Sequence, residues 1–235
     1  MQRLDKFLAS NTPLSRNEVH DAIKYGRVVI NGLKAKQKDQ KIDEQTDKVF
    51  WDNQEVCYKK YIYLMLNKPS GVVSATNDKK QKTVLDLLPT HLKKFDLFPC
   101  GRLDKDTLGL VILTNDGKNA HRLLSPKNHV EKTYEFVCAN NLTDLDIRQI
   151  ECGIQLKDGY ITKPCKINLI LNNTGTITIT EGKYHEIKRI FGAIGNRITF
   201  LKRISFGKIL LDEKLKDGEY RELNYNEQKY FEGKI

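Results

Sequence analysis

The chain has 235 residues, of which 39% are hydrophobic and 30% are charged. It has no run of about 18 apolar residues and no signal-like apolar stretch near its start, so we expect a cytoplasmic protein that neither spans a membrane nor carries a secretory signal. The 40 Lys and Arg residues outnumber the 30 Asp and Glu residues, which gives a net charge of +10. This excess suits a polyanionic partner such as a nucleic acid, although an ordinary basic protein could also carry it.

Five cysteines are scattered singly, without a CxxC pair: Cys57, Cys100, Cys138, Cys152 and Cys165. An odd number of isolated cysteines favours reduced thiols over a disulfide framework or a zinc site. The sequence also lacks a GxGxxG fingerprint and a P-loop, so no motif in it indicates a nucleotide cofactor.

The amino-terminal part predicts two helices followed by a hairpin. Apolar residues at helical spacing predict the first helix over residues 2–10. The second helix begins at Ser15, because Ser15 and Glu18 have the spacing of a capping box. Gly26 is a stop for this helix, and the dipeptide Asn31-Gly32 after a short apolar run is a strong hairpin signal.

Basic residues are concentrated in this part of the chain. Residues 1–41 contain nine basic and four acidic residues, an excess of five that is half of the net charge of the protein. On so small a unit, several of these side chains must share a surface that could follow a phosphate backbone, unless they form an ordinary solvated face.

The segments RLDKFLA (3–9) and SRNEVHDAIKYGRVVING (15–32), with the lysine-rich tail after them, resemble the S4 RNA-binding domain. The resemblance implies that residues 1–59 bind structured RNA through the face that carries Arg16, Lys24 and Arg27.

Residues 60–235 predict a second, larger domain. Strands are expected over residues 61–66, 110–114, 133–138, 167–171 and 176–180, and helices over residues 118–124 and 142–151. We therefore predict an α+β fold with a mixed, largely antiparallel sheet.

Segment GRLDKDTLGL (101–110) places a carboxylate, Asp104, in a charged loop between two glycines and before an apolar strand. A rigid strand could hold such a carboxylate in a cleft. Alternatively, Asp104 could cap the next turn or pair with Arg102.

In EKTYEF (131–136), the strand alternation puts Lys132, Tyr134 and Phe136 on one face. A tyrosine beside a cation could stack on a flipped base, and an amphipathic strand with a packed tyrosine would show the same pattern.

In EGKYHEIKRIF (181–191), His185 and Glu186 suggest the HExxH zinc motif, but Arg189 stands where its second histidine belongs, so that interpretation fails. Lys188 and Arg189 instead form a basic cluster that could neutralise a carboxylate or a phosphate, or could be a solvated helix face.

These three segments, in this order behind an S4-like unit, resemble the pseudouridine synthases of the ribosomal small-subunit type. The stretches NKPSGVVS (67–74), SPKNHVEKTY (125–134) and DGYITKP (158–164) are more similar to the branch that modifies uridine 516 of 16S ribosomal RNA than to the large-subunit branches. The resemblance implies an isomerase that needs no metal or cofactor and acts on 16S ribosomal RNA or an assembling small subunit. A monomer is the default expectation.

The resemblance also implies the roles of individual residues. Asp104 would be the essential carboxylate, either a nucleophile on the ribose or a base that opens a glycal intermediate, and Lys188 would keep it ionised. Tyr134 would stack on the flipped uracil and help with proton transfer. Leu201 would pack against the base and Arg102 would contact the RNA backbone. Lys132 and Arg189 would add substrate contacts.

Three other functions remain open on the sequence. The chain could be a large-subunit ribosomal RNA pseudouridine synthase, a non-catalytic RNA-binding ribosome assembly factor that keeps the fold, or an RNA hydrolase that uses Asp104 with Asp106. The hydrolase lacks the supporting histidine or third acid of a metal site, and activity in excess chelator would separate it from a synthase.

Overall fold

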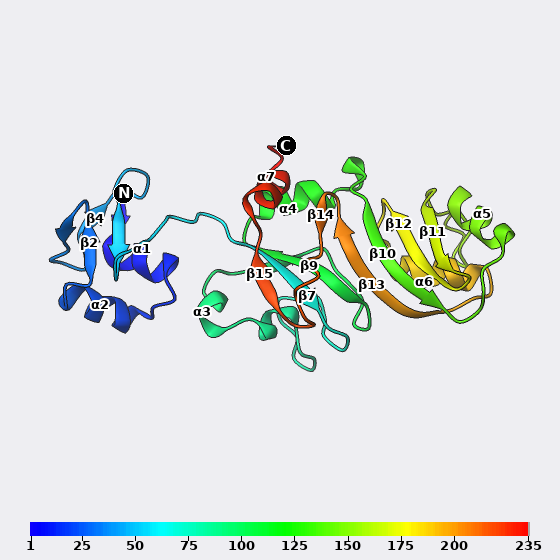
Figure 1. Cartoon of the computed structure of the whole chain (residues 1–235), viewed down its shortest axis with the longest axis horizontal. Helices are drawn as coiled ribbons and strands as arrows, with labels where there is room; N and C mark the ends of the chain where they lie inside the picture. Colours follow the sequence, from blue (N-terminus) through cyan, green and yellow to red (C-terminus); the bar gives the residue numbers. More distant parts are fainter. Residues whose placement is uncertain (235) are drawn as a thin grey trace. The chain divides into compact units, whose positions relative to one another are not determined.

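The computed structural model describes residues 1–234 and divides them into two compact units (Figure 1). The first unit consists of residues 1–62 together with 88–97, and the second begins at residue 63 and resumes at residue 98. The end of the first stretch lies three residues beyond the boundary expected after residue 59. Each unit is described by itself below.

The first unit follows the local signals of its sequence. Ser15 caps the second helix, with a capping box in which the backbone N–H of Glu18 donates to the Ser15 side chain and the Glu18 carboxylate accepts from the Ser15 backbone N–H. Gly26, Asn31 and Gly32 all have positive φ angles of 67°, 49° and 83°, so the helix stop and the hairpin turn adopt the left-handed backbone that these residue types favour. The elements of this unit are β1 (Gln2–Arg3), α1 (Leu4–Asn11), α2 (Arg16–Lys24), β2 (Val28–Ile30), β3 (Leu33–Lys34), β4 (Lys41–Ile42), β5 (Val49–Trp51), β6 (Gln54–Glu55) and α3 (Thr90–Lys93).

One apolar core holds these elements together. It contains Leu4, Phe7 and Leu8 of α1 and Val19 and Ala22 of α2, all of them at most 1% exposed, together with buried side chains of the small strands. The helix face expected from the apolar spacing is therefore the buried face.

The second unit is built on a nine-stranded mixed sheet, visible in Figure 1 as the run of neighbouring arrows from β15 to β11. Its central path runs β11-β12-β10-β13-β9-β7-β15, with β8 and β14 attached to β9 and β13. All pairs are antiparallel except β9 with β13, which confirms the expected α+β fold with a largely antiparallel sheet. The strands are β7 (Tyr63–Lys68), β8 (Phe98–Cys100), β9 (Leu108–Thr114), β10 (Lys132–Cys138), β11 (Lys166–Leu171), β12 (Thr174–Ile179), β13 (Ile198–Phe206), β14 (Ile209–Leu210) and β15 (Tyr220–Glu222).

Helices and short 3₁₀ turns complete this unit: η1 (Val84–Leu87), α4 (Gly117–Leu124), η2 (Pro126–Asn128), α5 (Asp144–Cys152), α6 (Glu186–Ala193) and α7 (Tyr225–Glu232). Helices α4 and α7 contact each other beside the sheet (Figure 1), where Tyr63 packs on Phe231 and donates a 2.8 Å hydrogen bond to Asp116. No helix within residues 1–234 has the length and apolar character needed to cross a membrane.

The parallel junction between β9 and β13 is where the sheet meets the charged loop of residues 101–107. Gly109 pairs with Arg203 at this junction and has a φ angle of 98°, and a Cβ at this position would lie 2.2 Å from the Arg203 carbonyl oxygen. Only glycine allows the two backbones to approach so closely. The start of β9, and with it the loop that carries Asp104, is thereby fixed against the centre of the sheet.

Candidate active site

Asp104 lies in a loop that backbone and side-chain hydrogen bonds hold in one conformation. The Thr107 N–H donates to the Asp104 carbonyl oxygen at 3.1 Å and closes a tight turn. The Leu103 N–H donates to the buried Ser74 hydroxyl at 3.1 Å. These bonds hold the loop in place without a bound substrate, and such order is what a side chain needs if it is to act in catalysis.

A buried lysine, Lys68, also holds this loop through hydrogen bonds to its backbone. The Lys68 ammonium is fully buried and donates to the carbonyl oxygens of Pro69, Lys105 and Thr107 at 3.0, 3.0 and 2.8 Å. Burial lowers the pKa of Lys68 to about 8, and the negative charges of Asp106 and Asp104 partly oppose this shift. Lys68 therefore holds two carbonyl groups of the turn that presents Asp104, those of Lys105 and Thr107.

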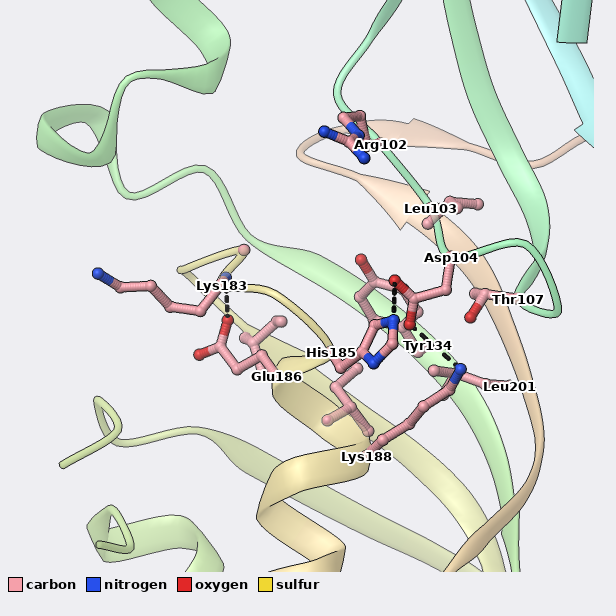
Figure 2. A pocket seen from close by; sticks show the side chains of 13 residues that line it. Arg102, Leu103, Asp104, Thr107, Tyr134, Lys183, His185, Glu186, Lys188 and Leu201 are labelled. Atoms are coloured by element: carbon pink, nitrogen blue, oxygen red, sulfur yellow. Dashed lines mark hydrogen bonds and ion pairs between the residues drawn. The ribbon is translucent and has the colours of Figure 1, made fainter. Parts of the chain in front are cut away.

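Two side chains from the start of helix α6 face the Asp104 carboxylate (Figure 2). The Lys188 ammonium lies 3.2 Å from one carboxylate oxygen, and the His185 Nε2 atom lies 3.5 Å from the other. Among the described residues, the ion pairs of Asp104 come from this helix and not from the neighbouring Arg102. The alternative that Asp104 pairs with Arg102 is therefore wrong.

Lys188 also pairs with Asp106 at 2.5 Å. Burial lowers the pKa of Lys188, but the hydrogen bonds and charges of Asp106 and Asp104 outweigh it and raise the pKa overall. The Lys188 hydrogen bond in turn lowers the pKa of Asp106. The site thus contains a protonated amine between two carboxylates at neutral pH.

Tyr134 lies on β10 and forms one wall of the site. Its side chain is buried, and burial raises the pKa of its hydroxyl, although the nearby Arg203 guanidinium acts in the opposite direction. Arg203 is the cross-strand neighbour of Tyr134 on β13, is 2% exposed and donates from Nε to the Leu110 carbonyl oxygen at 2.7 Å. The tyrosine therefore presents a neutral ring held against a buried cation.

These groups surround a small open cavity of about 60 Å³. Its lining residues are Arg102, Leu103, Asp104, Thr107, Tyr134, Ile179, Gly182, Lys183, His185, Glu186, Ile187, Lys188 and Leu201. Five of the expected site residues therefore lie together although they come from four separate segments: Arg102, Asp104, Tyr134, Lys188 and Leu201. A cavity with apolar walls, an aromatic ring and a paired carboxylate can bind a flat heterocycle and bring that carboxylate to the atoms attached to it.

Two expected contact residues lie outside this cavity lining. Lys132 donates to the Val130 carbonyl oxygen at 2.8 Å and lies over the Phe206 ring, 5.7 Å from its centre. Arg189 forms a 2.5 Å ion pair with Asp158. The structure therefore does not bring either cation to Asp104.

Arg16, Lys24 and Arg27 belong to the first unit, and all three are exposed. Arg16 begins helix α2 and Lys24 ends it. Arg27 forms an ion pair with Asp52, so part of its charge is already compensated. Arg16 and Lys24 form no ion pair with the residues that the structure describes, so their charges remain available on this face.

The sequence alone assigns no role to four residues that build the site: Lys68, Thr107, His185 and Glu186. The Thr107 hydroxyl is buried in the cavity wall without a hydrogen-bond partner among the described residues. Glu186 is 5% exposed, burial raises the pKa of its carboxyl group, and it accepts a 2.8 Å hydrogen bond from the Lys183 N–H, as Figure 2 shows. For His185 and Glu186, the only sequence signal is the failed zinc motif. Within residues 1–234, no group of three His, Cys, Asp or Glu side chains is placed to hold a metal ion.

Known proteins share this arrangement of sequence and fold. A family model described as RNA pseudouridylate synthase matches residues 62–193, which contain the whole of β7 to α6. An uncharacterized RNA pseudouridine synthase of Bacillus subtilis (strain 168) is 48% identical over 229 residues, with 96% of each chain covered. The ribosomal small subunit pseudouridine synthase A of Haemophilus influenzae (strain ATCC 51907 / DSM 11121 / KW20 / Rd) is 38% identical over 226 residues, with 96% of this chain and 97% of the relative covered.

A crystal structure of a pseudouridylate synthase matches the whole chain at 36% identity, with a TM-score of 0.69 and all of both chains covered. Both the sequence and the fold around the Asp104 cavity are thus those of one enzyme family. This chain belongs to the RNA pseudouridylate synthases, the isomerases that convert uridine to pseudouridine in RNA.

Proposed function

We propose that this enzyme isomerises uridine 516 of 16S ribosomal RNA, and that its substrate is that RNA or an assembling small ribosomal subunit. The support is the similarity to small-subunit enzymes over nearly the full chain. Three such relatives, from Haemophilus influenzae, Pasteurella multocida and Yersinia pestis, are 38%, 39% and 40% identical, each over 96% of this chain. We further propose that the enzyme works as a monomer in the cytoplasm.

Asp104 is the proposed acting carboxylate. Pseudouridine formation breaks the bond between uracil N1 and ribose C1′ and joins C1′ to C5 of the same base, without redox change or net hydrolysis. Asp104 either attacks the ribose or removes a ribose proton to give a glycal. Lys188 stabilises the ionised form that both routes require, because its ammonium lies 3.2 Å from the carboxylate.

Tyr134, Leu201 and Arg102 are the proposed substrate contacts. The Tyr134 ring stacks on the flipped uracil and Leu201 packs against it, while the exposed Arg102 contacts the RNA backbone. Extruding a base from a helix costs a few kcal/mol. Aromatic stacking and charge contacts in the cavity stabilise the extruded base by an energy of the same order, so they can offset this cost.

Residues 1–59 are proposed to be an S4-like docking unit that binds structured RNA through Arg16, Lys24 and Arg27. Such contacts with phosphates are sensitive to salt and tolerant of sequence, so they hold the RNA on the enzyme without choosing the uridine.

The observation that carries the proposal is the meeting of Asp104, Lys188 and Tyr134 in one cavity. Chemical mapping of pseudouridine in 16S and 23S ribosomal RNA, from cells with and without this gene, tests it. The predicted result is the loss of one pseudouridine from 16S RNA. A loss confined to 23S RNA, or no loss, would show that the assigned substrate is wrong.

A further inference from the structure

We propose that Tyr184 is a stacking platform for a base next to the target uridine. Its ring lies at the rim of the Asp104 cavity and receives the base that precedes or follows that uridine in the RNA strand. This inference rests on the proposed binding of a flipped uridine beside Asp104, and it does not depend on which uridine is modified.

Tyr184 lies at the edge of the cavity and not inside it. Its two neighbours in the chain, Lys183 and His185, line the cavity, whereas Tyr184 does not. The Tyr184 ring stacks on the His185 ring at 3.8 Å between centres, with 18° between the ring planes. The His185 Nε2 atom in turn lies 3.5 Å from the Asp104 carboxylate. Two contacts thus join the Tyr184 ring to the proposed acting group, so a nucleotide attached to the uridine at Asp104 comes within reach of this ring.

One face of the Tyr184 ring is open. The residue is 75% exposed, more than any other aromatic residue within residues 1–234. Because His185 covers one face of the ring, so large an exposure requires that the opposite face be in contact with solvent. Single exposed aromatic residues are common on protein surfaces, but this ring stands beside a site for a base. Every base has a flat π-face, and stacking it on the ring removes both surfaces from water.

Hydrogen bonds hold the backbone around Tyr184 in one conformation. The Lys183 N–H donates to the Glu186 carboxylate at 2.8 Å, and the Glu186 N–H donates to the Lys183 carbonyl oxygen at 3.2 Å. The Arg189 guanidinium donates to the Tyr184 carbonyl oxygen at 3.5 Å. A tyrosine side chain has only two χ angles, so a ring on a fixed backbone loses little conformational entropy when a base stacks on it.

Extrusion of the uridine creates the need for such a platform. When the uridine leaves the helix, each adjacent base loses a stacking partner. The cavity of about 60 Å³ has no room for a second base, so the adjacent bases stay outside it. A ring at the rim replaces the lost stacking partner of one of them, and the exposed Lys183 places a positive charge nearby for the connecting phosphate. Stacking of this kind accepts any base, so Tyr184 contributes affinity and position without reading the sequence.

The test compares Tyr184→Leu, which removes the aromatic ring, with Tyr184→Phe, which keeps the ring and removes only the hydroxyl. Tyr225 provides the matched control. It is 69% exposed, lies on α7 of the same unit and does not line the cavity, so Tyr225→Leu makes the same change elsewhere. RNA affinity is measured with each change in an Asp104→Asn background, where RNA binds without turnover, and single-turnover rates are measured with Asp104 intact.

The RNA is a synthetic strand whose target uridine the wild type converts. It is made in three forms: unmodified, with an abasic residue before the target uridine, and with an abasic residue after it. An abasic residue keeps the sugar and the phosphates and removes only the base. Because the RNA is chosen by its conversion, a wrong assignment of the target in 16S RNA changes the strand that is used and leaves the test of Tyr184 intact.

We expect Tyr184→Leu to weaken binding of the unmodified RNA about tenfold, as for the loss of one base–aromatic stack, and Tyr184→Phe to stay within about twofold. One of the two abasic strands should bind about tenfold more weakly than the unmodified strand when Tyr184 is present, and Tyr184→Leu should weaken its binding no further. Single-turnover rates at saturating RNA should change less than about threefold, because the stack contributes to binding and not to the reacting atoms. Tyr225→Leu should match the protein with Tyr225 in affinity and rate.

Four results would overturn the inference. A normal affinity of Tyr184→Leu would mean that the ring does not contact the RNA. Equal losses in Tyr184→Phe and Tyr184→Leu would assign the effect to the hydroxyl. A loss in Tyr184→Leu that persists on both abasic strands would show that no adjacent base stacks on the ring. A reduced single-turnover rate with unchanged affinity would mean that Tyr184 only orients His185 and Asp104.

Discussion

Lys188 neutralises two carboxylates, and it lies closer to the one that is not proposed to react. Its ammonium is 2.5 Å from Asp106 and 3.2 Å from Asp104. Asp106 is 69% exposed and can remain paired while substrate occupies the cavity. The longer contact leaves an Asp104 oxygen able to turn toward the ribose, while the positive charge that favours its ionised form stays in place.

Replacing Lys188 by glutamine should lower kcat about 100-fold, because a charged group that stabilises the reacting carboxylate is removed from a partly buried site. RNA affinity should change much less, since Lys188 is one contact among many. Single-turnover rates and filter-binding affinities separate the two effects.

The neighbouring residue offers the control for this change. Arg189→Gln removes the same charge from the same helix, but Arg189 pairs with Asp158 and does not line the cavity. It should leave kcat within about threefold of the wild type, in line with the small energies of partly exposed ion pairs. Equal reductions of kcat in both variants would mean that general positive charge, and not the Lys188–Asp104 pair, matters.

Lys68 should make the protein more stable as the pH rises. A lysine held in an ion pair, whose pKa is raised in the folded state, would have the opposite effect. Its pKa is lowered from 10.5 to about 8 in the folded state, so the unfolded chain binds more protons between these values. Stability rises with pH wherever the unfolded state binds more protons. The free energy of unfolding of the wild type, measured relative to Lys68→Met, should therefore increase from about pH 8 to about pH 10.5.

Urea unfolding of the wild type and of Lys68→Met across this pH range gives the difference between their free energies of unfolding. Lys132, whose pKa burial also lowers to about 8, is present in both proteins and cancels. If the free energy of unfolding of the wild type relative to Lys68→Met is constant or falls with pH, a charged Lys68 is not buried in the folded protein.

At the scale of elements, the contact between β9 and β13 decides where the loop of Asp104 stands. The two strands pair through Leu108 with Lys202 and through Gly109 with Arg203. A side chain at residue 109 would separate the two strands just after the loop of residues 101–107 ends.

Gly109→Ala should therefore destabilise the protein by at least about 3 kcal/mol, from the steric clash and the positive φ angle together. Gly159→Ala measures the cost of the positive φ angle alone. Gly159 has a φ angle of 84°, but no atom of the described residues lies within 4 Å of the place that a Cβ would occupy, so its replacement should cost only about 1 kcal/mol. Urea unfolding measures both values, and equal values would contradict the close approach at the junction.

Local elements can be predicted from the sequence, and pairings between distant strands cannot. The capping box at Ser15, the stop at Gly26 and the Asn31-Gly32 turn depend on residues a few positions apart, and all three are confirmed. The expected strand over residues 61–66 is observed as Tyr63–Lys68. The sequence does not predict β13 and β15, because their partners β9 and β7 lie about 90 to 160 residues away in the chain and no local pattern specifies them.

The site is predictable where a motif marks it. The family resemblance identifies Asp104, Tyr134 and Lys188, and the structure places them together. Lys68 looks like part of a loop in the sequence, because the carbonyl groups that justify burying a lysine come partly from residues 105 and 107. His185 stands in a motif that fails for zinc, and its position beside Asp104 depends on the fold.

At the scale of the whole molecule, basic charge is divided between the proposed docking surface of the first unit and the cavity around Asp104. Half of the net charge lies in the first 41 residues. In the cavity, by contrast, the Lys188 charge is largely compensated by the two carboxylates. RNA affinity should therefore depend mainly on the first unit and turnover on the second.

The double variant Arg16→Gln/Lys24→Gln should weaken binding to ribosomal RNA about tenfold at low salt and reduce the salt dependence of the affinity by about one unit of slope for each phosphate that is no longer neutralised. Its kcat at saturating RNA should not change. Lys118→Gln/Lys214→Gln removes two exposed charges from the second unit and serves as the control. Identical affinities and salt slopes in the two double variants would contradict a docking role for the first unit.

The most direct test of Asp104 as the reacting group is complementation of cells that lack this gene. Wild-type protein or Asp104→Asn is supplied, pseudouridine is mapped in ribosomal RNA, and RNA affinity is measured on the purified proteins. We predict that the wild type restores the missing pseudouridine and that Asp104→Asn restores none, although it folds and binds RNA within about threefold of the wild type because asparagine has the same shape. Restoration of the pseudouridine by Asp104→Asn would contradict the assignment of the chemistry to this carboxylate.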